Sequence, residues 1–285
     1  MKLVKGLFKF VLILLVLVIG LAVGGYFYIR SAYDIDVLSA IGIVRTVNEP
    51  VDEAELCPNA FDASDMVDVQ TEVNKSVENM IEDSLEHGYS INFDELPSEM
   101  KHIIKLTDRQ IGALTQTVLE QEWGGKITVG EWEVPVQLLQ TDFLNVNDSS
   151  MTMNMTAKLD ISVFKGKMDS APLSWFKKWV PEELYISSTV DVLKGLLPFE
   201  YTVQHNSLTV NGLDDEETEE LFHILDTFFD IGTAEDMNMM VGTAVVDSMI
   251  GSEEHTGIAY SLKEIGAKDY LFLVENGEEY FSVTL

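Results

Sequence analysis

The sequence has few of the residues that usually carry cross-links or catalysis. Cys57 is the only cysteine among 285 residues, so no disulfide can form within the chain and a packed core must hold the fold together. Its acidic neighbours Glu53, Glu55 and Asp62 argue against an activated thiolate. The nucleophile-elbow, phosphate-loop, zinc-protease and C-x-x-C motifs are all absent.

Metal-ligating patterns are equally weak. The five histidines stand at spacings that place no metal pair on one helix face. Asp62, Asp65 and Asp68 recur every three residues, but they lack the glycine and the bidentate glutamate of an EF-hand loop. We therefore expect a protein that is not an enzyme and that carries no metal and no cofactor.

Basic residues are scarce beyond the N-terminus. The formal net charge is −30, and all 48 acidic side chains follow residue 30, together with only 14 of the 18 basic ones. A body this acidic repels nucleic acid and anionic lipid at long range, which excludes nucleic acid as an expected partner.

One long apolar run stands at the N-terminus. Residues 10–29, "FVLILLVLVIGLAVGGYFYI", contain no charge, and 20 residues make a helix of about 30 Å, which matches a hydrocarbon core. Three lysines precede the run, and Asp34 and Asp36 follow it. The positive-inside rule then predicts a single-pass protein of the cell membrane, with a cytoplasmic N-terminus and an extracytoplasmic body. A cleavable signal peptide is the alternative, although its apolar core is usually shorter, about 7–15 residues.

The rest of the chain divides into a linker and a body. Residues 1–30 are the expected transmembrane anchor, 31–64 an acidic linker or stalk without sustained periodicity, and 65–285 an extracytoplasmic α+β domain. Helical periodicity predicts a helix over about 65–87. Another begins after Thr107, which forms a capping box with Gln110, and ends at Gly124.

From residue 126 to 210 the period changes from 3.6 to 2. Apolar residues alternate with polar ones from Met151 to Val163, which predicts a long strand of an antiparallel sheet with one apolar face. The segment 199–212 reads as a hairpin that turns near residues 205–207, and helices follow over 214–230 and 233–251. Asn276-Gly277 predicts a final hairpin. The expected fold is a long-stranded, curved antiparallel sheet packed with helices.

Methionines cluster on two of these elements. Methionine is flexible and polarisable, and it recurs on surfaces that accept varied apolar partners. If the long strand and the helix over 233–251 face each other, their apolar residues line a candidate ligand groove: Met151, Met153, Met155, Leu159, Ile161, Met237, Met240 and Met249. Ordinary core packing is the alternative.

A second candidate contact is the stretch "APLSWFKKWVP" at residues 171–181. Tryptophan and lysine are favoured where apolar carbon meets lipid headgroups, so this stretch has the composition of a membrane or partner contact. Its candidate residues are Trp175, Phe176, Lys177, Lys178 and Trp179. The tryptophans would otherwise be structural plugs at the end of a curved sheet.

The order of these parts resembles the YpmS-like membrane-anchored proteins of Gram-positive bacteria. The resemblance covers about residues 106–229, with the segments "LTDRQIGALTQTVLEQEW", "LLQTDFLNVNDSSMTMNMTAKLDIS" and "YTVQHNSLTVNGL". The family typically opens its body with L-T-x-x-Q-(I/L)-N, and here Gly112 replaces the asparagine. The resemblance implies an architecture similar to tubular lipid-binding domains, in which a curved sheet wraps a helix around an apolar groove. It implies no catalytic residues.

Two functions fit these observations. The first is a membrane-anchored extracytoplasmic binding protein that holds a lipid or another apolar ligand at the cell envelope. The second is a non-enzymatic envelope scaffold that binds another protein. A divalent-cation sensor is a third reading, supported only by the acidic charge.

Overall fold

The computed structural model describes most of the chain after the N-terminal run. The described residues are 28, 30–32, 34–69, 71, 102–129, 132–169, 177, 180–252, 257–265 and 267–284. The predicted anchor therefore lies almost wholly outside them, and among the described residues no helix is both long and apolar enough to cross a bilayer.

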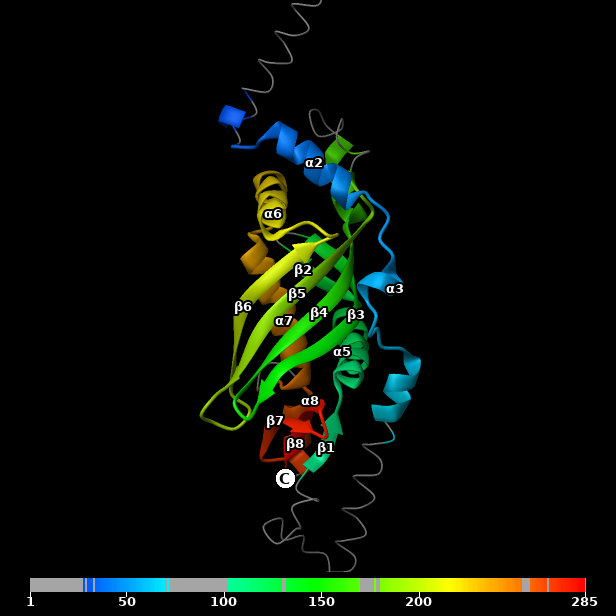
Figure 1. Cartoon of the computed structure of the whole chain (residues 1–285), viewed down its shortest axis with the longest axis vertical. Helices are drawn as coiled ribbons and strands as arrows, with labels where there is room; N and C mark the ends of the chain where they lie inside the picture. Colours follow the sequence, from blue (N-terminus) through cyan, green and yellow to red (C-terminus); the bar gives the residue numbers. More distant parts are fainter. Residues whose placement is uncertain are drawn as a thin grey trace, which may run out of the picture.

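Two antiparallel sheets form the β structure (Figure 1). The larger sheet is a curled five-stranded meander in chain order, made of β2 (Lys126–Val129), β3 (Trp132–Asn147), β4 (Ser150–Asp160), β5 (Glu183–Lys194) and β6 (Tyr201–Val210). The smaller has the order β1-β8-β7, from β1 (His102–Leu106), β7 (Asp269–Glu275) and β8 (Glu278–Thr284). The predicted α+β class, with a curved antiparallel sheet packed with helices, is confirmed.

Strand β4 follows the predicted alternation but ends earlier. Met151, Met153 and Met155 are all buried, whereas Thr152 and Asn154 between them are half-buried. The strand stops at Asp160 and not at Val163, because the Asp160 carboxylate accepts a hydrogen bond of 2.9 Å from the main-chain N–H of Ser162. That local bond starts the 3₁₀ helix η2 (Ile161–Asp169).

The predicted hairpin within residues 199–212 is wrong. Strand β6 runs unbroken from Tyr201 to Val210 and pairs with β5 along its whole length. The register shifts between Thr189 and Val190, which pair with Ser207 and His205. Asn206 is thus the extra residue of a β-bulge, a local irregularity that composition does not distinguish from a turn. The predicted Asn276-Gly277 hairpin is confirmed, with positive φ at both residues.

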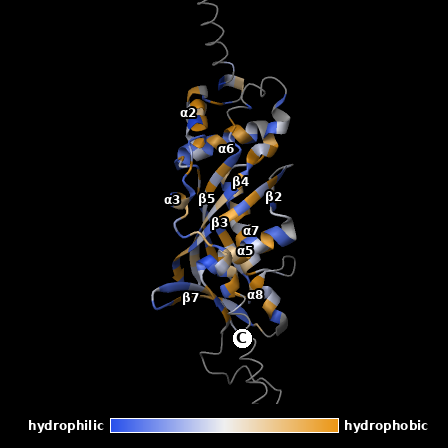
Figure 2. Cartoon of the chain, turned by 90° about the vertical axis from the view of Figure 1, so that its right-hand side faces the viewer, coloured by the Kyte–Doolittle hydropathy of each residue, from blue (hydrophilic) through white to orange (hydrophobic). Residues whose placement is uncertain are grey.

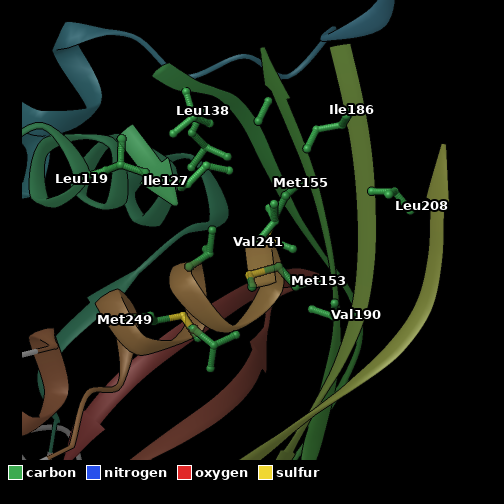
Figure 3. Packing of buried hydrophobic residues seen from close by; sticks show 14 of the residues in the cluster. Leu119, Ile127, Leu138, Met153, Met155, Ile186, Val190, Leu208, Val241 and Met249 are labelled. Carbon is green, nitrogen blue, oxygen red and sulfur yellow. The ribbon is translucent and has the colours of Figure 1, made fainter. Parts of the chain in front are cut away.

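Helices cover the concave side and one end of the large sheet. Helix α7 (Ala234–Met249) lies across the concave face, and α5 (Asp108–Trp123) packs beside it (Figure 3). At one end, α6 (Asp215–Phe229) contacts α2 (Val37–Val47). The capping box predicted from Thr107 is present, a second one joins Thr233 and Asp236 at the start of α7, and Gly124 ends α5 in the left-handed conformation.

The segment expected as a stalk contains helices and contacts the body. Helices α2 and α3 (Glu53–Leu56) lie within residues 31–64, and a further helix begins at residue 63. Asn59 donates hydrogen bonds from its side chain to Asp142 (2.9 Å) and Asp108 (3.2 Å). Arg109 binds both carboxylate oxygens of Asp65, at 3.1 and 2.9 Å. This strap, residues 48–69, covers the outer face of the sheet beside α5.

Close contact between α7 and the sheet depends on Gly242. A Cβ added there would lie 2.5 Å from Cγ1 of Val190, a fully buried residue of β5. A larger side chain would push the helix off the sheet, so the absence of a side chain sets the distance between these two elements.

We predict that Gly242→Ala destabilises the protein, with Gly42→Ala as the matched control. Both glycines lie in helices, and both substitutions gain about 1 kcal/mol of helix propensity. Only position 242 lacks room, because a Cβ at Gly42 meets nothing within 4 Å. Overpacking costs about 1–3 kcal/mol, so the free energy of unfolding from urea titrations should differ between the variants by that amount. Equal stabilities would contradict the close packing of α7.

Candidate functional site

The eight residues predicted to line a groove face a common core. Met153 and Met155 of β4 and Met249 of α7 lie in the space between the sheet and the helix (Figure 3), and Met151 and Met237 belong to the same buried cluster. Of the eight predicted residues, all but Met240 are at most 5% exposed. Helix α7 itself therefore covers the apolar concave face, as the core-packing alternative describes. A ligand-binding role for the seven buried residues stays a prediction.

Polar side chains fix α7 in this position. Asn238 of α7 is fully buried, and Ser188 of β5 donates a hydrogen bond to its Oδ1. Its Nδ2 donates to the carbonyl of Thr189 at 3.0 Å and also meets Nδ1 of His205 on β6. Further along α7, Ser248 donates to Thr115 of α5 at 3.0 Å. Buried hydrogen bonds of this kind permit one register of the helix, because any shift leaves polar atoms unsatisfied.

An open groove runs along the flank of α7, between this helix and the edge strand β2. Its volume is about 820 Å³. Its apolar wall consists of Ile127 of β2 together with three residues of α7: Met239, Met240 and Ala244. Ile127 belongs to the buried core, whereas the three helix residues are half-buried, so the groove exposes part of their surface. We take this flank groove as the candidate functional site.

The groove includes only one residue of the predicted set. Met240 lines it, whereas Met239 and Ile127 were not predicted. The helix carries a second stripe at spacings of three and four residues, through Asp236, Met239 and Thr243 to Asp247, beside its core face. The sequence contains this stripe, but its acidic ends make it look like an ordinary solvent-facing surface.

Charged groups lie around the apolar wall. Lys126 of β2 pairs with Glu133 of β3 at 3.1 Å, and Asp236 and Asp247 lie on the helix side. Hydrogen bonds from the main chain and the hydroxyl of Thr233 lower the pKa of Asp236, so this carboxylate stays charged at neutral pH. Asp247 accepts a hydrogen bond from the hydroxyl of Tyr201. One ammonium thus faces three carboxylates in the groove.

The aromatic stretch at residues 171–181 lies mostly outside the described residues. This applies to Trp175, Phe176, Lys178 and Trp179, so their predicted membrane or partner contact stays a prediction. Lys177 is described, is half-buried, and pairs with Asp169 of η2 at 2.6 Å.

Metal-ligating side chains are not clustered within the described part of the chain. There, no three His, Cys, Asp or Glu side chains cluster closely enough to hold a metal ion. The Cys57 thiol is buried, and desolvation is the main cause that raises its pKa, so little reactive thiolate forms at neutral pH.

We predict that Asn238→Ala lowers stability by about 1–3 kcal/mol, because Ser188 and the Thr189 carbonyl lose their buried partner. Asn206→Ala, at an exposed position of β6, is the control and should change stability by no more than about 0.5 kcal/mol. Urea unfolding measures both values. A neutral Asn238→Ala would show that the buried network does not anchor α7.

Comparisons with known proteins add little to this description of the candidate site. No family model matches the chain, and no curated protein matches it. A solved structure titled "Crystal structure of lipopolysaccharide binding protein" is similar to 66% of this chain at 12% identity, with a TM-score of 0.22. The chain spans 44% of the length of that protein. The candidate site therefore rests on the contacts within this chain.

Proposed function

We propose that the protein is a membrane-anchored extracytoplasmic binding protein that holds an apolar chain, such as a lipid acyl chain, in the flank groove. The observation that carries the proposal is a groove of about 820 Å³ whose apolar wall consists of the buried Ile127 and the half-buried Met239, Met240 and Ala244. Small-molecule sites usually measure about 300–1,000 Å³ and combine an apolar lining with a few polar groups. Methionines suit such a wall, because they adapt to chains of different shape.

The charges around the groove restrict the class of ligand. A phosphate or carboxylate headgroup beside Asp236 and Asp247 would meet repulsion, which the single cation Lys126, already paired with Glu133, does not offset. A neutral or cationic head would meet no such penalty. We therefore propose a neutral or amine-bearing lipid over a strongly anionic one.

The anchoring part of the proposal rests on the sequence. Residues 10–29 are uncharged and follow three lysines, whereas the body is acidic. The positive-inside rule orients such a chain with its body outside the cytoplasm. A lipid-binding groove on a tethered body would then lie close to the membrane that supplies its ligand.

We predict that Ala244→Phe empties the groove of lipid. Residues 31–285 are purified and analysed by native and denaturing mass spectrometry for co-purified lipid. Ala244 is half-buried in the groove wall, so a phenyl ring there occupies ligand space, and the lipid recovered per mole of protein should fall several-fold.

Ala54→Phe is the matched control, since Ala54 is an exposed helical alanine of α3 outside the groove. It should leave the lipid content unchanged. A wild-type protein that is repeatedly free of lipid, or equal lipid in the two variants, would contradict lipid binding in this groove.

A second prediction concerns the aromatic stretch. We expect the double substitution Trp175→Ala and Trp179→Ala in residues 31–285 to weaken co-sedimentation with liposomes, because tryptophan favours the bilayer interface. The melting temperature should change little. A large loss of stability with unchanged liposome binding would show instead that the tryptophans are structural plugs.

A protein-binding scaffold is the second candidate function, and the β5–β6 turn favours it. Leu196 is 102% exposed and Leu197 is 67% exposed at this tip. The Glu200 carboxylate accepts hydrogen bonds of 3.0 Å from the main-chain N–H groups of both leucines, which holds the tip in a defined shape. Exposed apolar residues on a well-ordered tip are typical of protein contacts. A purified protein without bound lipid would favour this scaffold function over lipid binding.

A further inference from the structure

Helix α2 has apolar residues on both of its sides. Ile43 and Val47 are buried against the body, with 1% and 4% exposure. On the opposite side Leu38 is 71% exposed and Ile41 is 61% exposed, three residues apart and therefore neighbours on one face. A helix at the surface of a soluble body normally turns charged residues outward, so this outer face calls for an apolar environment.

The outer face is held in a fixed orientation. The Ser39 hydroxyl donates a hydrogen bond to Glu220 of α6, and Asn211 donates one of 2.8 Å to the carbonyl of Val47 at the end of α2. At the start of the helix, the Asp36 side chain accepts a bond of 2.9 Å from the N–H of Leu38. Because both ends of α2 are tied down, Leu38 and Ile41 cannot turn into the core.

The charge of α2 also differs from that of the rest of the protein. Residues 37–47 contain no acidic side chain and one cation, Arg45, in a chain with a formal net charge of −30. Arg45 is exposed at the end of the same outer face. An apolar face edged by a cation is the composition of a helix that lies in a membrane interface, where the cation meets lipid phosphates.

Chain length places α2 beside the predicted anchor. Seven residues, or eight Cα–Cα steps, lie between Ile29 at the end of the apolar run and Val37 at the start of α2. Even fully extended, they span at most about 29 Å, and residues 30–32 are helical, which shortens the reach. A bilayer crossed by residues 10–29 would therefore lie within a short distance of α2.

We infer that α2 lies in the plane of the membrane interface, with Leu38 and Ile41 inserted at the boundary between headgroups and acyl chains. This inference rests on the anchoring part of the proposed function and adds an orientation of the body. Helices α2 and α6 lie at one end of the molecule in both views, and Figure 2 shows hydrophobic segments along α2 (Figures 1 and 2). The α2 end faces the bilayer, and β7 and β8 at the opposite end point away from it.

Spin labels on the full chain test this orientation. Single cysteines replace Leu38 or Ile41 on α2, and Val274 on β7 is the matched control, because it is also an exposed apolar residue, at 54%. Native Cys57 is buried with a raised pKa and should not react with the label, which the unsubstituted chain verifies. Each labelled chain is reconstituted into vesicles of phosphatidylethanolamine and phosphatidylglycerol, and collisions of the label with oxygen and with an aqueous nickel chelate are measured.

We expect the labels at positions 38 and 41 to collide several-fold more with oxygen than with the chelate, and the label at 274 to show the reverse. Labels at 38 and 41 that collide freely with the chelate, in chains that float with the vesicles, would overturn the inference while the anchor stands. Labels that are protected from both oxygen and the chelate would also overturn the inference. Such protection indicates that α2 contacts protein, either a partner or a second copy of this chain. Chains that fail to float with the vesicles would instead refute the anchor.

Discussion

The architecture depends on the packing of helix α7 against the concave face of the curled five-stranded sheet. The five-stranded sheet turns an almost unbroken apolar face inward, and α7 covers it at a distance that Gly242 and Val190 allow. Asn238 then fixes the register of the helix through hydrogen bonds to β5 and β6. Burial supplies the driving force, and the buried amide of Asn238 selects one arrangement among the many that apolar packing alone would permit.

The flank groove is a consequence of the way α7 packs on the sheet. A curled sheet with a helix on its concave face leaves the edge strand β2 beside the helix and not underneath it. The second stripe of α7 therefore borders β2 without a covering element from the described residues. The stripe carries Met239 and Thr243 between two acidic ends, Asp236 and Asp247, so apolar and charged groups border the same groove.

The outer face of the sheet is partly covered by the strap, residues 48–69. Gln140 on β3 is polar, yet it is only 5% exposed because the strap lies over it. The next residue, Thr141, points to the opposite face, where its hydroxyl donates a hydrogen bond of 2.6 Å to the carbonyl of Asp108 at the start of α5. The N–H of Asn59 donates to the Gln140 side chain at 2.9 Å, and Phe61 packs so close to Gly112 that a Cβ there would lie 2.4 Å from the ring. This contact leaves no room for a side chain at position 112. An N-terminal segment that the sequence presents as a linker thus belongs to the packed body.

Local patterns determined much of this protein from its sequence alone. The capping boxes at Thr107 and Thr233, the alternation of β4 and the Asn276-Gly277 hairpin depend on neighbours within a few residues, and short-range geometry decides them. Only the tertiary structure decided that α7 fills the concave face, that Asn206 is a bulge and that Met239, not Met153, borders a groove. Those outcomes depend on partners that are far apart in the chain, such as Ile127 of β2 and Ala244 of α7 in the groove wall. The sequence around an apolar residue does not indicate whether a helix or a ligand will cover its side chain.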